Sequence, residues 1–305
     1  MKNVFITTYP FGVSSKDPID ALETLTALGY NYHLNDLKRK FTRDELLERL
    51  RKINPSVIIA GAEKYDKEAL DICTNLKVIS RVGVGVSSIN IPECDKRNIK
   101  ILNTPDAPSN AVAELVLAQV LNASRGIFRS NVSGWKKFTG REISNLKIGI
   151  IGFGRIGRLI AEKFTLLGSP KIFVNDKFPM ISDEFEFEKK EDLIKKSDVI
   201  IVQTPGDEEI IGKKEFTLIK SDAIIVNMSR GKSVNEDDLY GWLLNNKDAT
   251  GIVDVFRKEP YSGPLTSLEN AILTPHIASS TLSSRRGMET GAAVNAAEFL
   301  RGEND

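Results

Sequence analysis

Short apolar runs alternate along this chain with segments in which apolar residues recur at helical spacing. Near-continuous apolar runs predict buried strands, because strands covered by helices on both faces lose the polar alternation. These runs lie at residues 147–151, 171–174, 198–202 and 223–226, with shorter ones at 4–6, 57–60, 78–80, 101–102 and 271–273. The alternation predicts βαβ units and parallel sheets, and therefore an α/β fold.

Helices are predicted between these strands. The stretch Thr42-Arg43-Asp44-Glu45 is a capping box, and it opens a helix that runs to about Lys52. Residues 111–121 are almost all apolar or small, which is typical of a long buried helix that crosses between domains. Further helices are expected over residues 18–29 and from 281 to about 301.

Composition narrows the function classes. A length of 305 residues corresponds to about two domains. The net charge of +1 gives no electrostatic reason to expect a nucleic acid or a membrane surface as partner. No apolar stretch approaches the roughly 18 residues of a membrane span, and the first residues do not resemble an export signal. We therefore expect a cytoplasmic protein.

Cys73 and Cys94 form neither a CxxC motif nor a pair with a histidine. We expect both to be reduced, buried or half-buried thiols, and no metal site.

A glycine motif follows the strand at 147–151, in the order Gly152-Phe153-Gly154-Arg155-Ile156-Gly157. A strand before and a helix after are the context of a dinucleotide-binding turn, although a plain βα turn would also accommodate glycines. Gly152 permits the tight turn, Gly154 lets a pyrophosphate approach, and Gly157 lets the helix pack closely. The amides at Arg155 and Ile156 would then point at the pyrophosphate.

An acidic residue stands where such a site binds the ribose. Asp176 comes 19 residues after Gly157 and directly after a strand, and a carboxylate there hydrogen-bonds the ribose 2′-OH. It also repels a 2′-phosphate, so the sequence favours NAD over NADP. Lys177 weakens this preference only slightly. The alternative is a solvated carboxylate at a strand end.

The catalytic candidates come from three predicted strand ends. His33 is interpreted as a surface residue, whereas His276, Arg230 and the acidic pair Asp254 and Glu259 each follow an apolar run. Reactive groups gather at the carboxyl ends of parallel strands. An arginine can bind a carboxylate and polarise a carbonyl, and a histidine can deliver a proton. A glutamate can hold the imidazole in its charged form and correct tautomer. This set suits hydride transfer to a 2-oxo acid.

Taken together, these motifs resemble the D-isomer specific 2-hydroxyacid dehydrogenase family, and within it the phosphoglycerate-dehydrogenase-like branch. The resemblance runs from about Leu76 to Glu298 and depends on several blocks in the family's order. Besides the glycine motif, these are residues 81–86, 103–105, 111–114, 226–231, 254–260 and 274–279.

The resemblance implies that Arg230, Glu259 and His276 are the catalytic residues. It also implies that Asp254 hydrogen-bonds the nicotinamide carboxamide of NAD. Arg230 would in addition bind the substrate.

Further site residues are implied in the same way. The backbone amides of Val84 and Gly85 would hold the substrate carboxylate. Thr204 and Pro205 would line the adenosine side of the cofactor. Arg81 corresponds to a residue that meets the substrate phosphate in phosphoglycerate dehydrogenases, while a surface or domain-interface arginine is an equally good interpretation.

The fold that the resemblance implies has two Rossmann-like lobes with parallel sheets. Residues 1–102 and 284–305 would form a flavodoxin-like substrate and catalytic lobe, and residues 103–283 a doubly wound NAD-binding lobe. By analogy with the family, residues 111 to about 140 would form the contact of a homodimer.

The sequence departs from the family pattern at three places. Ser87 stands where an aspartate is usual, and Gln203 where a histidine is usual. The loop at residues 206–209, Gly-Asp-Glu-Glu, is shorter and more acidic than usual.

The expected function is NAD-dependent interconversion of a small D-2-hydroxy acid and its 2-oxo acid. Candidate substrates include 3-phosphoglycerate and related acids. The alternative is an NAD(H)-sensing binding protein, similar to the transcriptional corepressors that share this scaffold.

Overall fold

The computed structural model describes residues 2–13, 15–130, 137–178 and 184–302. The chain divides into two compact units, one formed by Met1–Pro108 with Ser280–Asp305 and the other by Ser109–Ser279. The boundaries that the sequence predicts, at 102/103 and 283/284, lie a few residues away from those of the units. The predicted α/β class with parallel sheets and two Rossmann-like lobes is confirmed.

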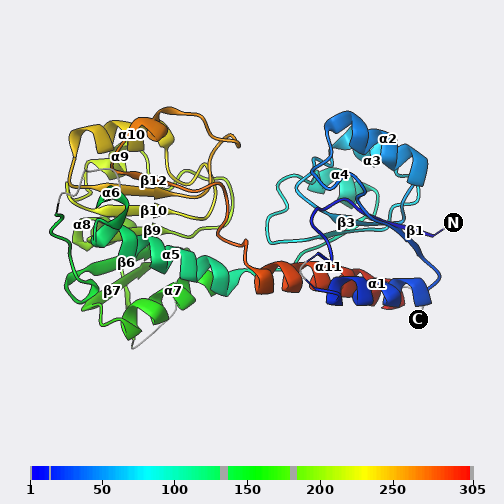
Figure 1. Ribbon diagram of the computed structural model, residues 1–305, viewed down its shortest axis with the longest axis horizontal. Helices are drawn as coiled ribbons and strands as arrows, with labels where there is room; N and C mark the ends of the chain where they lie inside the picture. Colours follow the sequence, from blue (N-terminus) through cyan, green and yellow to red (C-terminus); the bar gives the residue numbers. More distant parts are fainter. Residues whose placement is uncertain (1, 14, 131–136, 179–183, 303–305) are drawn as a thin grey trace. The chain divides into compact units, whose positions relative to one another are not determined.

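The first unit is a parallel sheet covered by helices on both faces (Figure 1). Its strands are β1 (Asn3–Ile6), β2 (Asn31–His33), β3 (Val57–Ala60), β4 (Val78–Arg81) and β5 (Lys100–Leu102). Its helices are α1 (Asp17–Ala27), α2 (Arg43–Ile53), α3 (Lys67–Ile72), α4 (Ile91–Lys96) and α11 (Leu282–Gly302). The strand order β2-β1-β3-β4-β5 is that of flavodoxin-like folds.

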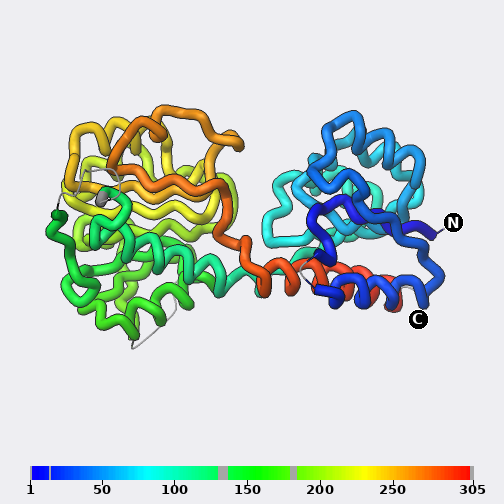
Figure 2. Tube along the Cα trace, viewed as in Figure 1, coloured from blue at the N-terminus to red at the C-terminus, as the bar shows by residue number. Residues whose placement is uncertain are grey.

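Alternate residues of the central strands β1, β3 and β4 enter different cores. Val4 and Ile6 pack with α1 and α11, whereas Phe5 packs with α2, α3 and α4 on the other face. The C-terminal helix α11 therefore lies beside α1 and completes the unit that the N-terminus begins (Figure 2). This explains why the unit is discontinuous in sequence.

The capping box forms as predicted. The Thr42 hydroxyl accepts from the Glu45 amide, and the Glu45 carboxylate accepts from the Thr42 amide, so α2 starts at Arg43. Each contact satisfies a backbone amide at the helix start, where intrahelical partners are missing.

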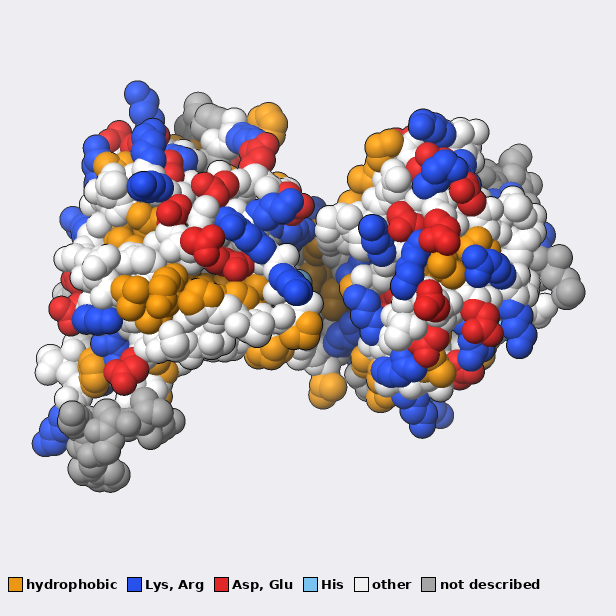
Figure 3. Space-filling model, turned by 90° about the horizontal axis from the view of Figure 1, so that it is seen from above, with side chains coloured by type: hydrophobic (Ala, Val, Ile, Leu, Met, Phe, Trp, Pro, Cys, Tyr) orange, Lys and Arg blue, Asp and Glu red, His pale blue; other side chains and the backbone are white. Residues whose placement is uncertain are grey.

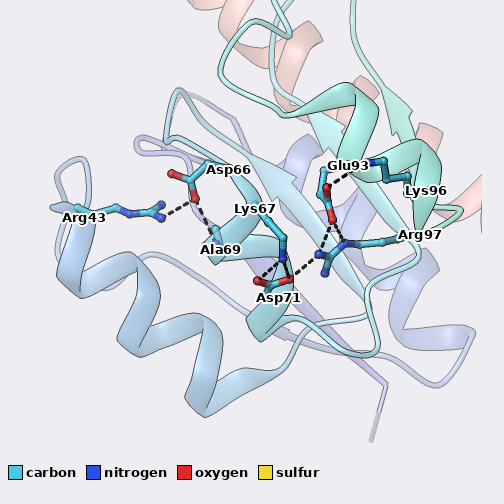
Figure 4. Close-up of polar contacts among 8 residues, drawn as sticks. All are labelled: Arg43, Asp66, Lys67, Ala69, Asp71, Glu93, Lys96 and Arg97. Carbon is cyan, nitrogen blue, oxygen red and sulfur yellow. Dashed lines mark hydrogen bonds and ion pairs between the residues drawn. The ribbon is translucent and has the colours of Figure 1, made fainter.

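A network of ion pairs covers the outer face of α3 and α4 (Figure 4). The Arg97 guanidinium contacts the carboxylates of Asp71 and Glu93, and Lys67 also contacts Asp71. Beneath this face both cysteines are buried, and burial raises the pKa of the Cys94 thiol to about 11. Buried thiols that stay protonated behave as small apolar side chains.

The second unit is also a parallel sheet between layers of helices (Figure 1). Its strands are β6 (Lys147–Ile151), β7 (Lys171–Asn175), β8 (Glu186–Phe187), β9 (Val199–Val202), β10 (Ile224–Asn227), β11 (Thr250–Val253) and β12 (Ala271–Leu273). Its helices are α5 (Ser109–Ser124), α6 (Ile127–Ser130), α7 (Arg155–Leu166), α8 (Lys190–Lys196), α9 (Lys213–Phe216) and α10 (Glu236–Asn245), with short 3₁₀ turns at Ile143–Asn145 and Pro264–Ser267.

The strand order of this sheet is β12-β11-β10-β9-β6-β7-β8. The chain therefore proceeds outward from β6 first in one direction and then, from β9, in the other. Ligands of open α/β sheets bind at the carboxyl edge beside such a reversal.

Helices α5 and α7 pack on one face of this sheet, and α8, α9 and α10 on the other. The sequence does not predict the short β8, because its two residues carry no run that a pattern could reveal.

Basic and acidic side chains are interspersed on the face drawn in Figure 3. Within the described ranges, no helix is both long and apolar enough to cross a membrane. The described residues also contain no group of three or more His, Cys, Asp or Glu side chains that could hold a metal ion. Residues 131–136 of the predicted dimer segment lie outside the described residues.

Candidate active site

The turn after β6 can be built only with glycine at two positions. Gly152 has a φ of +99°, and a Cβ there would lie 2.4 Å from the Gln203 carbonyl oxygen. A Cβ at Gly157 would lie 2.2 Å from the Gly152 carbonyl oxygen, so the start of α7 packs directly on the turn. A Cβ at Gly154, by contrast, would have no described atom within 4 Å, and the space in front of the turn is open.

Helix α7 begins at this open space. Gly154 occupies its N-cap and provides no side-chain acceptor for the first amides of the helix, which include those of Arg155 and Ile156. The first amides of a helix have no carbonyl partner within the helix, and together with the helix dipole they favour a negatively charged group. The turn and the start of α7 therefore suit a pyrophosphate.

Asp176 lies beside this turn, directly after β7. Its Oδ2 accepts from the Phe153 amide at 2.7 Å, and its Oδ1 accepts from the Phe178 amide at 2.9 Å. The carboxylate is half-buried and fixed against the glycine turn. It can still accept further hydrogen bonds, because each oxygen has two lone pairs.

The loop after β9 lies next to β6 and carries Gln203, Thr204 and Pro205. The Gln203 amide donates to the Ile151 carbonyl at 2.7 Å, which ties this loop to the end of β6. The Thr204 hydroxyl oxygen and the Gln203 side-chain oxygen are buried and have no hydrogen-bond partner among the described residues. Buried polar atoms of this kind are rare in native proteins, and a group bound at this edge can supply their hydrogen bonds. The residues of this edge thus fit a bound dinucleotide.

Arg230 is held by the loop after β10. The buried Asn227 side chain donates to the Arg230 carbonyl at 3.0 Å, and the Arg230 guanidinium donates to the Ser229 carbonyl at 2.7 Å. A Cβ at Gly231 would lie 2.1 Å from the Phe256 carbonyl carbon. The loop after β10 is therefore pressed against the loop after β11, and Arg230 is half-buried beside it.

Asp254 follows β11 and is fully buried. Its Oδ1 accepts from the Thr274 hydroxyl at 2.6 Å and from the Ile277 amide at 2.9 Å, and its Oδ2 accepts from the Ala278 amide at 2.9 Å. The His276 amide in turn donates to the Asp254 carbonyl at 2.9 Å. Asp254 thus holds the loop after β12 on both sides of His276.

His276 and Glu259 are in hydrogen-bond contact at this edge. The His276 Nδ1 lies 2.9 Å from Oε2 and 3.1 Å from Oε1 of Glu259, and Oε1 also accepts from the Phe256 amide at 3.0 Å. The His276 side chain is 57% exposed, and its backbone φ of +54° is unusual for a residue other than glycine. Such backbone strain is concentrated at functional sites. Because Nδ1 faces Glu259, Nε2 is the nitrogen that remains for a substrate.

The other predicted substrate residues belong to the first unit. The Arg81 guanidinium donates to the Val82 carbonyl and, at 3.5 Å, to the Ala60 carbonyl. The Val84 carbonyl accepts from the Asn103 side chain at 2.9 Å, which fixes the loop that carries Gly85. These residues and the pair formed by His276 and Glu259 therefore lie in different units of the chain.

Several positioning residues are not identified from the sequence. Thr274, Asn227 and Gly231 stand out there only as parts of family blocks. The hydrogen bond of Thr274 and the packing of Gly231 connect loops from different strands, and no local pattern reveals such contacts. The Asn227 side chain contacts Ser229 and Arg230 of its own loop. The exposed position of His33, by contrast, agrees with its interpretation as a surface residue.

Comparisons with known proteins point to one family. A model described as "D-isomer specific 2-hydroxyacid dehydrogenase, NAD binding domain" matches residues 115–278. A glyoxylate reductase of Thermococcus gammatolerans is 34% identical over 286 residues, which are 87% of this chain and 85% of that protein. A D-3-phosphoglycerate dehydrogenase of Methanocaldococcus jannaschii is 33% identical over 94% of this chain, which spans 57% of that protein. The crystal structure of the TT0316 protein from Thermus thermophilus has a TM-score of 0.85 at 27% identity, covering 98% of this chain and 97% of that one.

Proposed function

Since the chain belongs to the D-isomer specific 2-hydroxyacid dehydrogenase family, we propose that Arg230, Glu259 and His276 catalyse its reaction. The enzyme is an NAD-dependent oxidoreductase that interconverts a small D-2-hydroxy acid and its 2-oxo acid. The observation that carries the catalytic assignment is the contact of His276 Nδ1 with Glu259 at the carboxyl edge of the NAD-binding sheet.

We assign proton transfer to His276. In reduction of the 2-oxo acid, Nε2 donates a proton to the carbonyl oxygen as negative charge develops there, and in oxidation it accepts that proton. Glu259 holds Nδ1 as the donor toward its own carboxylate and so fixes the orientation and tautomer of the ring. This leaves Nε2 directed away from the pair.

Arg230 binds the carboxylate of the substrate and polarises the carbonyl. A guanidinium is always charged and presents paired donors in a fixed plane, so it suits a 2-oxo carboxylate better than lysine would. The hydrogen bonds that hold its own loop limit the freedom of the side chain, and such preorganisation is favourable for catalysis.

The cofactor supplies the hydride when it is bound. We assign the pyrophosphate to Gly152, Gly154, Gly157 and the first amides of α7, and the adenosine ribose to Asp176. Thr204 and Pro205 line the adenosine side, in agreement with the Thr204 hydroxyl that has no partner among the described residues.

The contacts of Asp254 support a positioning role more directly than a contact with the cofactor. Both of its oxygens already accept hydrogen bonds from the His276 loop, and the side chain has no exposed surface. Contact with the nicotinamide carboxamide would use the remaining acceptor capacity of the same carboxylate.

For the substrate we favour a small monocarboxylate such as glyoxylate over a phosphorylated acid. The Val84 and Gly85 amides would hold its carboxylate. Arg81, the candidate for a distal phosphate, already donates to the carbonyls of Ala60 and Val82. Several similar proteins are named glyoxylate reductase, which supports the same choice.

We further propose the roles of the units and the assembly. The first unit acts as the substrate and catalytic lobe, the second as the NAD-binding lobe, and residues 111–140 as the contact of a cytoplasmic homodimer. Size-exclusion chromatography with light scattering would report the mass of the assembly.

A panel of 2-oxo acids tests the proposal. Purified protein is mixed with NADH and with glyoxylate, hydroxypyruvate, pyruvate or 3-phosphohydroxypyruvate, and absorbance of NADH is followed. We expect oxidation of NADH with glyoxylate or hydroxypyruvate. If NADH binds but no 2-oxo acid oxidises it, the enzyme assignment fails and the NAD(H)-sensing alternative is supported.

A further inference from the structure

An exposed ion pair spans the glycine turn of the NAD-binding unit. Lys177 Nζ lies 2.8 Å from Glu208 Oε2. Lys177 follows β7, whereas Glu208 lies in the loop after β9, and β6 separates these two strands in the sheet. The pair therefore reaches across the carboxyl end of β6, where the turn at Gly152 begins.

The position of Lys177 places this pair beside the proposed binding site of the adenosine ribose. Its sequence neighbour Asp176 is fixed against the glycine turn and is the proposed partner of the adenosine ribose. A phosphate on the 2′-oxygen would bring up to two negative charges to that place, and it would require a cation to balance Asp176. Lys177 is the cation next to Asp176 in the sequence, and the Glu208 carboxylate engages it.

The other acidic residues of the loop at 206–209 also pair with neighbouring basic side chains. Asp207 lies 3.5 Å from Lys232, and Glu209 lies 3.5 Å from Arg257. Glu209 also accepts from the Asn235 side chain at 2.9 Å, which anchors the loop to the start of α10. The hydrogen bond from Lys177 lowers the pKa of Glu208, so the carboxylate stays ionised at neutral pH.

We infer that Glu208 is a specificity-determining residue that favours NAD over NADP by engaging Lys177. The inference rests on the cofactor site proposed above. It assigns a role to the unusual composition of the loop after β9, which the catalytic mechanism leaves unexplained. Asp176 repels the 2′-phosphate directly, and Glu208 occupies the neighbouring cation that would offset this repulsion.

Binding of NADH and NADPH without substrate tests the inference. The two nucleotides differ only in the 2′-phosphate, and nucleotide fluorescence gives both dissociation constants. Because an exposed ion pair contributes little, Glu208→Gln should lower the ratio of Kd for NADPH to Kd for NADH by about two- to fivefold at low ionic strength. The effect should shrink at high salt, where exposed charges are screened.

Two further variants separate the mechanism from a general charge effect. Lys177→Ala combined with Glu208→Gln should abolish the gain, because the cation that Glu208 had engaged is then gone. Asp222→Asn is the matched control: it removes one negative charge from an exposed pair with Arg141, before β10 at the opposite edge of the sheet. It should leave the Kd ratio unchanged.

An unchanged ratio in Glu208→Gln would overturn the inference, as would an equal gain in Asp222→Asn or in the double variant. Absence of nucleotide binding to the wild-type protein would overturn it together with the cofactor site. Absence of turnover with 2-oxo acids would contradict the proposed reaction but leave this result standing, since binding is measured without substrate.

Discussion

Two carboxylates control His276 in different ways. Glu259 contacts the imidazole itself, at a site open to solvent. Asp254 is buried and contacts the backbone and Thr274 side chain of the loop that carries the histidine. We propose that Glu259 fixes the orientation and tautomer of the ring, and that Asp254 fixes the position of its loop.

Glu259→Gln should lower kcat for reduction by about 10²-fold, which lies within the usual contribution of acid–base catalysis. Loss of the carboxylate removes the acceptor of the Nδ1 hydrogen bond, which holds the orientation and tautomer of the ring. Steady-state kinetics with a 2-oxo acid measure the effect, and a wild-type kcat would contradict the proposed role of the pair.

Asp254→Asn should affect folding as well as activity. The amide can accept at one end only, so its NH₂ group would face a donor of the His276 loop. We expect the free energy of unfolding to fall by about 1–3 kcal/mol, together with a lower kcat. Denaturant unfolding and kinetics check these effects, and a variant with wild-type stability and kcat would show that the loop does not depend on the carboxylate.

At the scale of elements, most of the strands and the glycine turn could be predicted because their signals are local. The apolar runs identified strands of both sheets, the capping box gave the start of α2, and the spacing of Gly152, Gly154 and Gly157 identified the turn. The contacts of Gly231 with Phe256 and of Asp254 with the next loop could not be predicted. They join residues whose proximity arises only when neighbouring strands pair.

Gly231→Ala tests how the loops after β10 and β11 fit together. The new Cβ would lie 2.1 Å from backbone of Phe256, so the loops must separate. We expect a loss of about 1–3 kcal/mol of stability, as in other overpacked sites, and a marked loss of activity. Gly241→Ala in α10 is the control, since nothing described lies within 4 Å of its Cβ. It should be neutral or stabilising by up to ~1 kcal/mol, and equal effects of the two substitutions would refute the packing argument.

At the scale of the whole molecule, ion pairs make the free energy of unfolding depend on pH. A hydrogen bond from Arg39 lowers the pKa of Glu45 to about 2, and hydrogen bonds from Arg97 lower the pKa of Asp71 and Glu93. A carboxyl whose pKa is lowered in the folded state stabilises the protein at pH values above its pKa in the unfolded state. That stabilisation is lost as the pH falls through the pKa of the group in the folded state.

We therefore expect the free energy of unfolding to decline between about pH 4.5 and pH 2. Urea unfolding at several pH values measures the decline, and Glu45→Gln should reduce its slope in the lower part of this range. A slope unaffected by Glu45→Gln would show that this pair contributes nothing.

Sequence alone indicated the α/β class, and the family resemblance indicated the discontinuous first lobe. The unit boundaries lie a few residues from the predicted ones, and Thr104 and Thr281, near the crossings, bond within the first unit. Such bonds leave no periodic signal in the sequence.

The most direct test of the account is the rate of NADH oxidation by glyoxylate or hydroxypyruvate in the wild-type protein and in His276→Gln, with NADH affinity measured in parallel. Glutamine keeps a polar side chain but cannot donate the proton as an imidazolium does. We expect kcat to fall by about 10²–10⁴-fold, while the Kd for NADH changes little. A His276→Gln variant that oxidises NADH at the wild-type rate would contradict the assignment of proton transfer to His276.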